Sequence, residues 1–389
     1  MRRIAVPYIP GDGIGPETIA VARAVVDSAV LASEGGSVSI SWEELPAGEA
    51  ARASSGEWLP VRTLARIREA GVALKGPLST PVGGGVRSLN VQLRQSLDLY
   101  ASVRPIRYFP GVPSPVRHPE RVDLVIFREN TEDVYKGIEW KRGSSELNRL
   151  REILRSDFAV DLGEDVGLGL KPISEGASKR LVRASIQFAV RNGRKSVTLV
   201  HKGNIMKFTE GAFRDWGYEL ALSEFRSSIV TEDELSDRKA CNGKVLVNDR
   251  IADNMFQQVL MRPEDYSVLA TPNLNGDYLA DACAAQVGGL GLAPGANMGD
   301  HVAVFEPVHG TAPKHVGKDV ANPCAAILSG AMMLEHLGLG AAGQVVVESV
   351  ASVLAAGVLT SDLARMDGHA EHIGTRAFGD AVVSEMECH

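Results

Sequence analysis

Short apolar runs alternate with longer amphipathic segments along most of this chain. The apolar runs have the length of buried strands, and several end in a loop that contains glycine. The predicted strands are Ile4–Ile9, Val72–Lys75, Leu124–Phe127, Ser196–Val200 and Val302–Phe305. The predicted helices are Thr18–Val30, Lys179–Val190, one that Asp249–Asp253 opens, Tyr278–Val287 after the turn signal Asn275-Gly276, and those within Asn322–Met386. Strands and helices in this order indicate an α/β protein.

One segment departs from this pattern. Residues Lys141 to Gly169 are highly charged and contain few large apolar side chains. Such a segment cannot build a core of its own, so we interpret it as an excursion from the main body. It is either a surface insertion or a clasp exchanged between subunits.

Composition narrows the class of protein. The chain has 389 residues, 44% hydrophobic and 23% charged, which is ordinary for a globular protein and enough for two domains or one large domain with an insertion. The net charge of −7 comes without a basic run, so nucleic-acid binding is not expected. No apolar stretch suits a membrane span or a secretory signal, and the four cysteines show no C-x-x-C spacing. We therefore expect a cytoplasmic location.

A glycine-rich loop follows the first predicted strand. Its sequence, Gly11 to Glu17, has the spacing G-x-G-x-G rather than G-x-G-x-x-G, and no Walker lysine follows. We therefore predict a tight strand-to-helix turn in preference to a dinucleotide phosphate loop.

Two aspartates form the strongest candidate for a metal site. Asp277 and Asp281 are four residues apart, so a helix places both carboxylates on one face. Such a pair repels itself unless a cation lies between the two groups, and Mg²⁺ or Mn²⁺ prefers oxygen ligands of this kind. Asp253 could supply a third carboxylate. The alternative is two solvated acids on an exposed face.

Several cationic residues stand in loops or at strand ends. Arg104 and Arg128 do so, and Arg87, Asn90 and Arg94 would share one side of a helix. Arginine binds carboxylates with two parallel hydrogen bonds, so the set predicts a pocket for an anionic substrate.

Two further loops carry candidate polar groups. Lys202, at a strand end beside glycine, is a candidate general base, although a surface lysine in a turn is the alternative. His309 and Lys314 lie in a loop of small residues after a strand, where they could face a nucleotide.

Four long segments resemble the decarboxylating dehydrogenase family of isocitrate and 3-isopropylmalate dehydrogenases, and most of all its bacterial NADP-type isocitrate branch. They are Lys75–Asn90, Val125–Tyr135, Leu199–Phe213 and Asn273–Tyr278. The resemblance implies an α/β fold that is not a Rossmann fold, with a large domain (1–100 and 290–389), a small domain (101–136 and 174–289) and a dimer clasp (137–173).

The resemblance also implies residue roles. Tyr135 and the partner's Lys202 would form the catalytic acid/base pair. Substrate binding would fall to Ser88, Asn90, Arg94, Arg104 and Arg128. Mg²⁺ or Mn²⁺ would bind Asp277, Asp281 and Asp253 of the partner subunit. The coenzyme, NADP or less favourably NAD, would contact Lys75, Ser79, Asn204, Arg262, His309, Gly310, Thr311, Ala312, Lys314, His315, Asn322, Ser361 and Arg365.

The implied protein is a homodimer with shared sites that oxidatively decarboxylates isocitrate, an anionic 2-hydroxy acid. Departures from the NADP-type pattern, among them a chain that is shorter around Arg226–Lys244, keep alternatives open. His315 and Ser361 replace tyrosines that help to hold the 2′-phosphate, and Glu306–Gly310 is worded as in the isopropylmalate branch. The alternatives are the same chemistry on an analogue, such as a phosphonomethylmalate of phosphonate biosynthesis, and a catalytically silent regulatory subunit. A metal-binding hydrolase lacks a positioned nucleophile.

Overall fold

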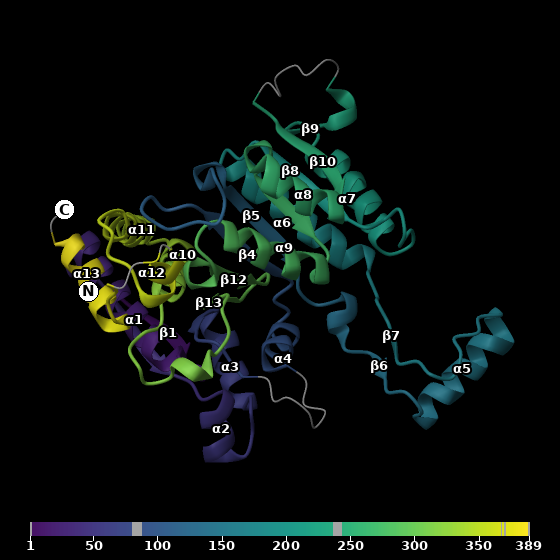
Figure 1. The fold of residues 1–389 in the computed structure, drawn as a ribbon, viewed down its shortest axis with the longest axis horizontal. Coiled ribbons are helices and arrows are strands. Elements are labelled where there is room, and N and C mark those ends of the chain that lie inside the picture. The colour runs from purple at the N-terminus through teal and green to yellow at the C-terminus, as the bar shows by residue number, and fades with distance from the viewer. Residues whose placement is uncertain (1, 80–87, 236–242, 367, 369–370, 388–389) are drawn as a thin grey trace.

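The computed structural model describes residues 2–79, 88–235, 243–366, 368 and 371–387, which form an 11-stranded sheet flanked by helices (Figure 1). In sheet order the strands are β2 (Val38–Glu44), β1 (Arg2–Ile9), β3 (Val72–Lys75), β13 (Ala303–Pro307), β12 (Pro294–Met298), β4 (Ala101–Arg107), β5 (Asp123–Glu129), β11 (Val268–Thr271), β8 (Ser196–His201), β10 (Val245–Ile251) and β9 (Ile229–Thr231).

The sheet consists of two parallel halves joined by antiparallel pairing. Strands β2, β1, β3 and β13 are parallel to one another, and so are β5, β11, β8, β10 and β9. Strands β12 and β4 connect the halves through antiparallel ladders. The first half draws strands from both ends of the chain and the second from its middle, while the domain boundaries given above remain predictions.

Helices cover both faces of the sheet. They are α1 (Gly15–Glu34), α2 (Gly48–Ser55), α3 (Val61–Ala70), α4 (Leu89–Ser96), α5 (Ser145–Phe158), α6 (Glu175–Arg191), α7 (Glu210–Glu224), α8 (Ala252–Met261), α9 (Asn273–Gln286), α10 (Cys324–His336), α11 (Gly340–Ala355), α12 (Ser361–Met366) and α13 (Thr375–Met386). Helices α1, α10, α11 and α13 pack together, as do α6 and α7, and both groups share one core. Helices α8 and α9 enclose a second core on the other face. None of the described helices combines the length and the apolar content needed to cross a lipid bilayer.

Strand β5 shows how the sequence directs side chains to these two cores. Val125 and Phe127 enter the core under α6, whereas Leu124 and Ile126 enter the core under α9. This is the alternation of a strand buried on both faces. Arg128 is the next residue in phase with Leu124 and Ile126, so it points toward α9. The sequence-based prediction ended this strand at Phe127 and was wrong by two residues.

Two other element boundaries also differ from prediction. Helix α9 begins at Asn273, so Asn275-Gly276 lies inside its first turn rather than in a turn before it. A Cβ on Gly276 would lie 2.2 Å from the Thr271 hydroxyl and 2.7 Å from Arg128, so this glycine permits close packing on β5 and not a chain reversal. Residues Asp249 to Ile251 end β10 instead of opening a helix, which starts at Ala252.

The glycine-rich loop after β1 forms the predicted tight turn. Gly11 and Gly13 have φ angles of 83° and 63°, which favour glycine. The Asp12 carboxylate accepts hydrogen bonds from the backbone N–H groups of Glu49 (2.8 Å) and Ser79 (2.7 Å). The loop thus anchors α1, α2 and the end of β3 on one another.

The charged excursion forms an arm that projects from the main body (Figure 1). It contains a two-stranded ribbon, β6 (Glu139–Trp140) with β7 (Leu168–Gly169), and helix α5 beyond it. Phe158 at the end of α5 is 68% exposed. An apolar side chain left uncovered on an isolated arm suits a segment that packs on another molecule, although the clasp itself stays a prediction.

Candidate active site

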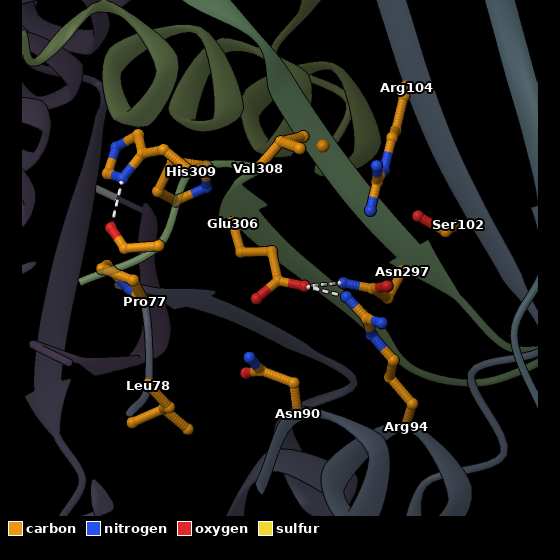
Figure 2. A pocket seen from close by; sticks show the side chains of 13 residues that line it. Pro77, Leu78, Asn90, Arg94, Ser102, Arg104, Asn297, Glu306, Val308 and His309 are labelled. Carbon is orange, nitrogen blue, oxygen red and sulfur yellow. Dashed lines mark hydrogen bonds and ion pairs between the residues drawn. The ribbon is translucent and has the colours of Figure 1, made fainter. Parts of the chain in front are cut away.

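A polar cavity opens where β4, β12 and β13 meet α4 (Figure 2). It encloses about 100 Å³, and its walls include Asn90 and Arg94 of α4, Ser102 and Arg104 of β4, and Glu306 of β13. Three predicted substrate residues therefore lie around one space. Of the other predicted residues, Ser88 directly precedes α4 and Arg128 lies under α9, while residues 80–87, including Arg87, fall outside the described part of the chain.

A buried carboxylate organises the floor of this cavity. Glu306 forms ion pairs with Lys75 and, at 2.9 Å, with Arg94, and it accepts a hydrogen bond of 2.7 Å from the Asn297 amide. Figure 2 shows Arg94 and Asn297 directed at the same Glu306 oxygen. Burial alone would raise the pKa of the Glu306 carboxyl, but the Lys75 and Arg94 cations outweigh it and hold that pKa well below its usual range.

The ion pair between Lys75 and Glu306 gives both residues a role that the sequence did not predict. Lys75, predicted to contact the coenzyme, is 1% exposed, is paired with Glu306 and lines neither of the cavities described here. Glu306 itself was not predicted to be a site residue. The available signal was an acidic residue at the end of an apolar strand run, a position at which an unpaired charge is costly.

Next to the cavity, three predicted residues converge on one aspartate, Asp277. Arg128 forms an ion pair with Asp277, and Arg104 approaches the same carboxylate at 3.6 Å. The Tyr135 hydroxyl donates a hydrogen bond to it as well. Arg104 also lies 3.3 Å from Asp281, one turn further along α9. The sequence interpretation that Asp277 and Asp281 share one helix face therefore agrees with the structure, which places a guanidinium against both.

Burial and neighbouring charges shift the pKa values of the groups around Asp277, some upward and some downward. Burial lowers the pKa of the Arg128 guanidinium to about 10. Burial and the hydrogen bond to Asp277 raise the pKa of the Tyr135 phenol to about 12, so the phenol keeps its proton at neutral pH. Burial would raise the pKa of Asp277, but the arginines lower it below its usual value, whereas burial leaves the pKa of Asp281 raised.

The donor set fits a divalent cation in part. Asp277 and Asp281 offer carboxylate oxygens on one face, and the raised pKa of Asp281 indicates that more positive charge can be accommodated there. Within the described ranges of the chain, however, no three His, Cys, Asp or Glu side chains come together as a metal site. A cation at the two aspartates would therefore need at least one ligand other than the His, Cys, Asp and Glu side chains that the structure describes.

The remaining predicted ligands lie elsewhere in the same chain. Asp253, in the first turn of α8, forms an ion pair with Lys202 after β8. Asn204 follows in the same exposed loop, and Arg262 directly follows α8 and donates a 2.8 Å hydrogen bond to Gln258. These four predicted residues line neither cavity. The structure does not bring Lys202 to Tyr135 within one chain.

A second cavity adjoins the first and encloses about 390 Å³. It brings together seven of the predicted coenzyme residues, namely His309, Gly310, Ala312, His315, Asn322, Ser361 and Arg365. His309 and Gly310 also line the first cavity, so the two spaces share a wall. Asp362, which the sequence interpretation missed, lines it too and accepts a 3.1 Å hydrogen bond from Asn322.

Three other predicted coenzyme residues lie near this cavity without lining it. The Thr311 carbonyl accepts a 3.0 Å hydrogen bond from the backbone of Ile14. Ser79 donates its backbone N–H to Asp12, and Lys314 is exposed in the short 3₁₀ helix η7 (Pro313–His315). Burial lowers the pKa of His309, so its ring is neutral at neutral pH.

Comparison with known proteins gives one consistent family. Residues 5–382 match the family described as isocitrate/isopropylmalate dehydrogenase. A protein named isocitrate dehydrogenase [NADP] from Archaeoglobus fulgidus is 56% identical over 98% of this chain and 92% of its own length. One of the same name from Staphylococcus aureus is 49% identical over 98% and 95%.

The solved structures agree. The crystal structure of isocitrate dehydrogenase from Methylococcus capsulatus superimposes with a TM-score of 0.82 and 38% identity, covering 99% of both chains. The match therefore extends over both halves of the sheet and both cavities. With more than nine-tenths of its length matched by the family and by relatives at 49–56% identity, this chain belongs to the isocitrate/isopropylmalate dehydrogenase family.

Proposed function

We propose that this protein catalyses the metal-dependent oxidative decarboxylation of isocitrate to 2-oxoglutarate and CO₂, with NADP as the hydride acceptor. The observation that carries the proposal is the pair of adjoining cavities. One is lined by Asn90, Arg94 and Arg104, and the other by the predicted coenzyme residues, with His309 and Gly310 between them. Close relatives bear the name isocitrate dehydrogenase [NADP], which favours isocitrate over the phosphonate analogue.

The chemistry of the first cavity supports a highly anionic substrate. Arg94 and Arg104 offer guanidinium groups suited to carboxylates. The buried Asn90 side-chain oxygen and the Arg94 Nε have no hydrogen-bond partner among the described residues, so a polar substituent can satisfy them. An isopropyl group would leave them unpaired, which is strongly unfavourable in a buried site. We therefore expect isopropylmalate to be a poor substrate.

The chain's own residues have separable tasks in this proposal. The arginines hold the carboxylates and orient the hydroxyl-bearing carbon toward the second cavity. The partner's Lys202 accepts the hydroxyl proton, and Tyr135, which retains its proton at neutral pH, delivers one to carbon after CO₂ has left. When bound, Mg²⁺ or Mn²⁺ supplies Lewis-acid polarisation of the substrate oxygens, and NADP supplies the hydride-accepting ring. Asp277 and Asp281 are the residues of this chain that would hold the cation.

Exposed apolar side chains support a homodimer with shared sites. Ile205, Phe208, Met261 and Tyr278 are all at least 60% exposed. Ile205 and Phe208 follow Lys202 in its loop, Met261 ends α8, and Tyr278 stands on α9 next to Asp277. An apolar surface at this position is covered if two copies pair about a twofold axis. Such pairing supports the predicted contribution of Lys202 and Asp253 to the partner's site.

Formation of reduced nicotinamide, followed by absorbance, tests the proposed function. Isocitrate, a phosphonate analogue and isopropylmalate are each assayed with NADP and with NAD, in the presence of Mg²⁺. We expect kcat/KM to be highest for isocitrate with NADP. A much higher value for the phosphonate analogue would replace the proposed substrate, and no turnover of any of the three would refute the proposal.

Subunit mixing tests the shared sites. Lys202→Ala and Tyr135→Phe subunits are co-expressed with two different affinity tags, so that the heterodimer can be purified. One of its two sites then contains an intact Tyr135 and an intact Lys202. We expect that heterodimer to recover activity that neither homodimer shows, and its failure to do so would contradict shared sites.

A further inference from the structure

A buried ionic cluster lies between the arm, the Tyr135 segment and the Lys202 loop. Its centre is Lys171, in the segment after β7 that leads from the arm back to the main body. The Lys171 ammonium forms ion pairs with Asp133 and, at 2.9 Å, with Glu210. Both carboxylates are buried, with side chains 1% and 0% exposed. Buried charges of this kind are costly and persist only where they are well compensated.

The negative charge of Glu210 is balanced mainly by hydrogen bonds from groups in neighbouring segments. One of its oxygens accepts a 2.5 Å hydrogen bond from the backbone N–H of Lys202 and a 2.8 Å hydrogen bond from the Asn275 amide. Its other oxygen faces Lys171 as an ion pair without an aligned hydrogen bond. The carboxylate therefore fixes the loop that carries Lys202 at its first residue after β8.

The Lys202 carbonyl accepts the backbone N–H groups of Ile205 (3.1 Å) and Met206 (3.0 Å), so the residues after Lys202 fold into a turn that is bonded to itself. Among the described residues, the Lys202 ammonium pairs with Asp253, whose carboxylate is exposed. The following residues Asn204 and Ile205 are exposed. At its start this turn is attached to buried groups, because Glu210 accepts the Lys202 N–H and the His201 ring accepts the Gly203 N–H at 3.0 Å.

We propose that Glu210, held in turn by Lys171, is a positioning residue that orients Lys202 for catalysis in the partner's site. The inference rests on the proposed function and on its shared sites. Because Lys171 lies at the base of the arm, the same cluster links the arm to the orientation of Lys202. Neither Glu210 nor Lys171 touches the cavities, so each acts through another group.

Glu210→Gln is the central variant, because glutamine keeps the shape and one acceptor but loses the charge that holds Lys171. Glu219→Gln is the matched control: Glu219 pairs with Lys179 at 2.9 Å on the surface, away from both cavities. We expect kcat of Glu210→Gln to fall about 10- to 100-fold, the scale of a misplaced catalytic group. The KM for isocitrate should change by less than about threefold, because Lys202 acts on the reacting hydroxyl. An unchanged kcat would overturn the proposal.

A heterodimer separates positioning of Lys202 from a general structural effect. Tagged heterodimers pair a Tyr135→Phe subunit with either a wild-type or a Glu210→Gln subunit. In the second pair, the site that keeps Tyr135 uses the Lys202 of the Tyr135→Phe subunit, whose Glu210 is intact. We expect equal activity from the two heterodimers. A Glu210→Gln heterodimer as impaired as its homodimer would show that Glu210 does not act through Lys202.

Hydrogen exchange provides a readout that needs no activity. The Lys202 amide should exchange faster in Glu210→Gln than in wild type or Glu219→Gln, because its acceptor is weakened. Lys171→Arg, which keeps the cation, should retain slow exchange, whereas Lys171→Met should not. If wild type fails to turn over isocitrate, the proposed function fails, and the exchange rates still decide whether Glu210 and Lys171 hold this loop. Unchanged exchange in both Glu210→Gln and Lys171→Met would refute that.

Discussion

Removing one partner of the buried ion pair between Lys75 and Glu306 should destabilise the folded protein by a predictable amount. Lys75 is 1% exposed and the Glu306 side chain 9% exposed, so neither charge can turn to water. Glu306→Gln removes the carboxylate that pairs with the buried Lys75 ammonium, which still donates a 2.9 Å hydrogen bond to the Gly76 carbonyl. Breaking a buried pair by removing one partner costs about 3–5 kcal/mol. The double variant Glu306→Gln/Lys75→Met should be less destabilised than Glu306→Gln, because no uncompensated charge remains.

This loss of unfolding free energy corresponds to a decrease in the melting temperature. Unfolding entropy is about 2.1 cal/mol/K per residue, or about 0.8 kcal/mol/K for this chain, so Glu306→Gln should lower Tm by about 4–6 °C at pH 7. The control is Glu43→Gln, which breaks a partly exposed 2.8 Å pair with Arg66. An exposed pair contributes less than about 1 kcal/mol, so that Tm should fall by about 1 °C or less.

The pH dependence gives the sign of the effect. Burial lowers the pKa of Lys75, and Glu306 opposes that shift. Without Glu306 the folded-state pKa of Lys75 falls further, while the unfolded chain keeps the ordinary value of about 10.4. Between those values the unfolded state binds more protons, so the stability of Glu306→Gln rises with pH. Calorimetry at pH 7 and pH 9.5, at one scan rate, should show the deficit shrinking. A deficit that stays constant or grows would refute the reasoning.

Three further predictions concern the proposed chemistry. Excess EDTA should abolish activity, and Asp277→Asn should weaken Mn²⁺ binding in calorimetric titration, because a carboxylate ligand is lost; undiminished turnover after metal removal would contradict this. Tyr135→Phe should lower kcat about 10²- to 10⁴-fold with little change in KM, and a wild-type kcat would exclude Tyr135 as the acid. NADP should be preferred over NAD, although less strongly than in tyrosine-bearing relatives. Arg365→Gln should reduce kcat/KM for NADP about tenfold or more while sparing NAD; equal losses with both coenzymes would show that Arg365 does not bind the 2′-phosphate.

The sequence predicted element types better than it predicted their contacts. Apolar runs identified β1, β3, β5, β8 and β13, because strands buried on both faces are continuous in hydrophobicity, whereas β4 and β12 at the junction of the two halves were not predicted. The start of α9 was wrong because Asn275-Gly276 has the composition of a turn, and only the packed structure shows that Gly276 is needed against β5. A local pattern cannot distinguish a glycine required by φ from one required by space.

The sequence did not predict the contacts between residues that lie far apart in the chain. Arg94 and Glu306 are 212 positions apart, and nothing near either residue predicts the other. The arginines were therefore interpreted as substrate binders only, whereas Arg94 also compensates a buried carboxylate. The residues themselves suggested chemistry for Lys202 and Asp253, but their assignment to the partner's site came from the resemblance, because no local pattern reports a twofold axis.

Net charge and local charge point in opposite directions in this protein, and the local charge decides which substrate can bind. The chain carries −7 overall, which by itself would disfavour a tricarboxylate. At physiological ionic strength, charges more than about 8 Å apart in solvent are largely screened. A substrate bound in the first cavity, as proposed, would therefore respond mainly to Arg94 and Arg104. Both guanidinium groups are already partly compensated, Arg94 by Glu306 and Arg104 by Asp277 and Asp281, so a cation bound by the two aspartates would free Arg104 to attract a carboxylate.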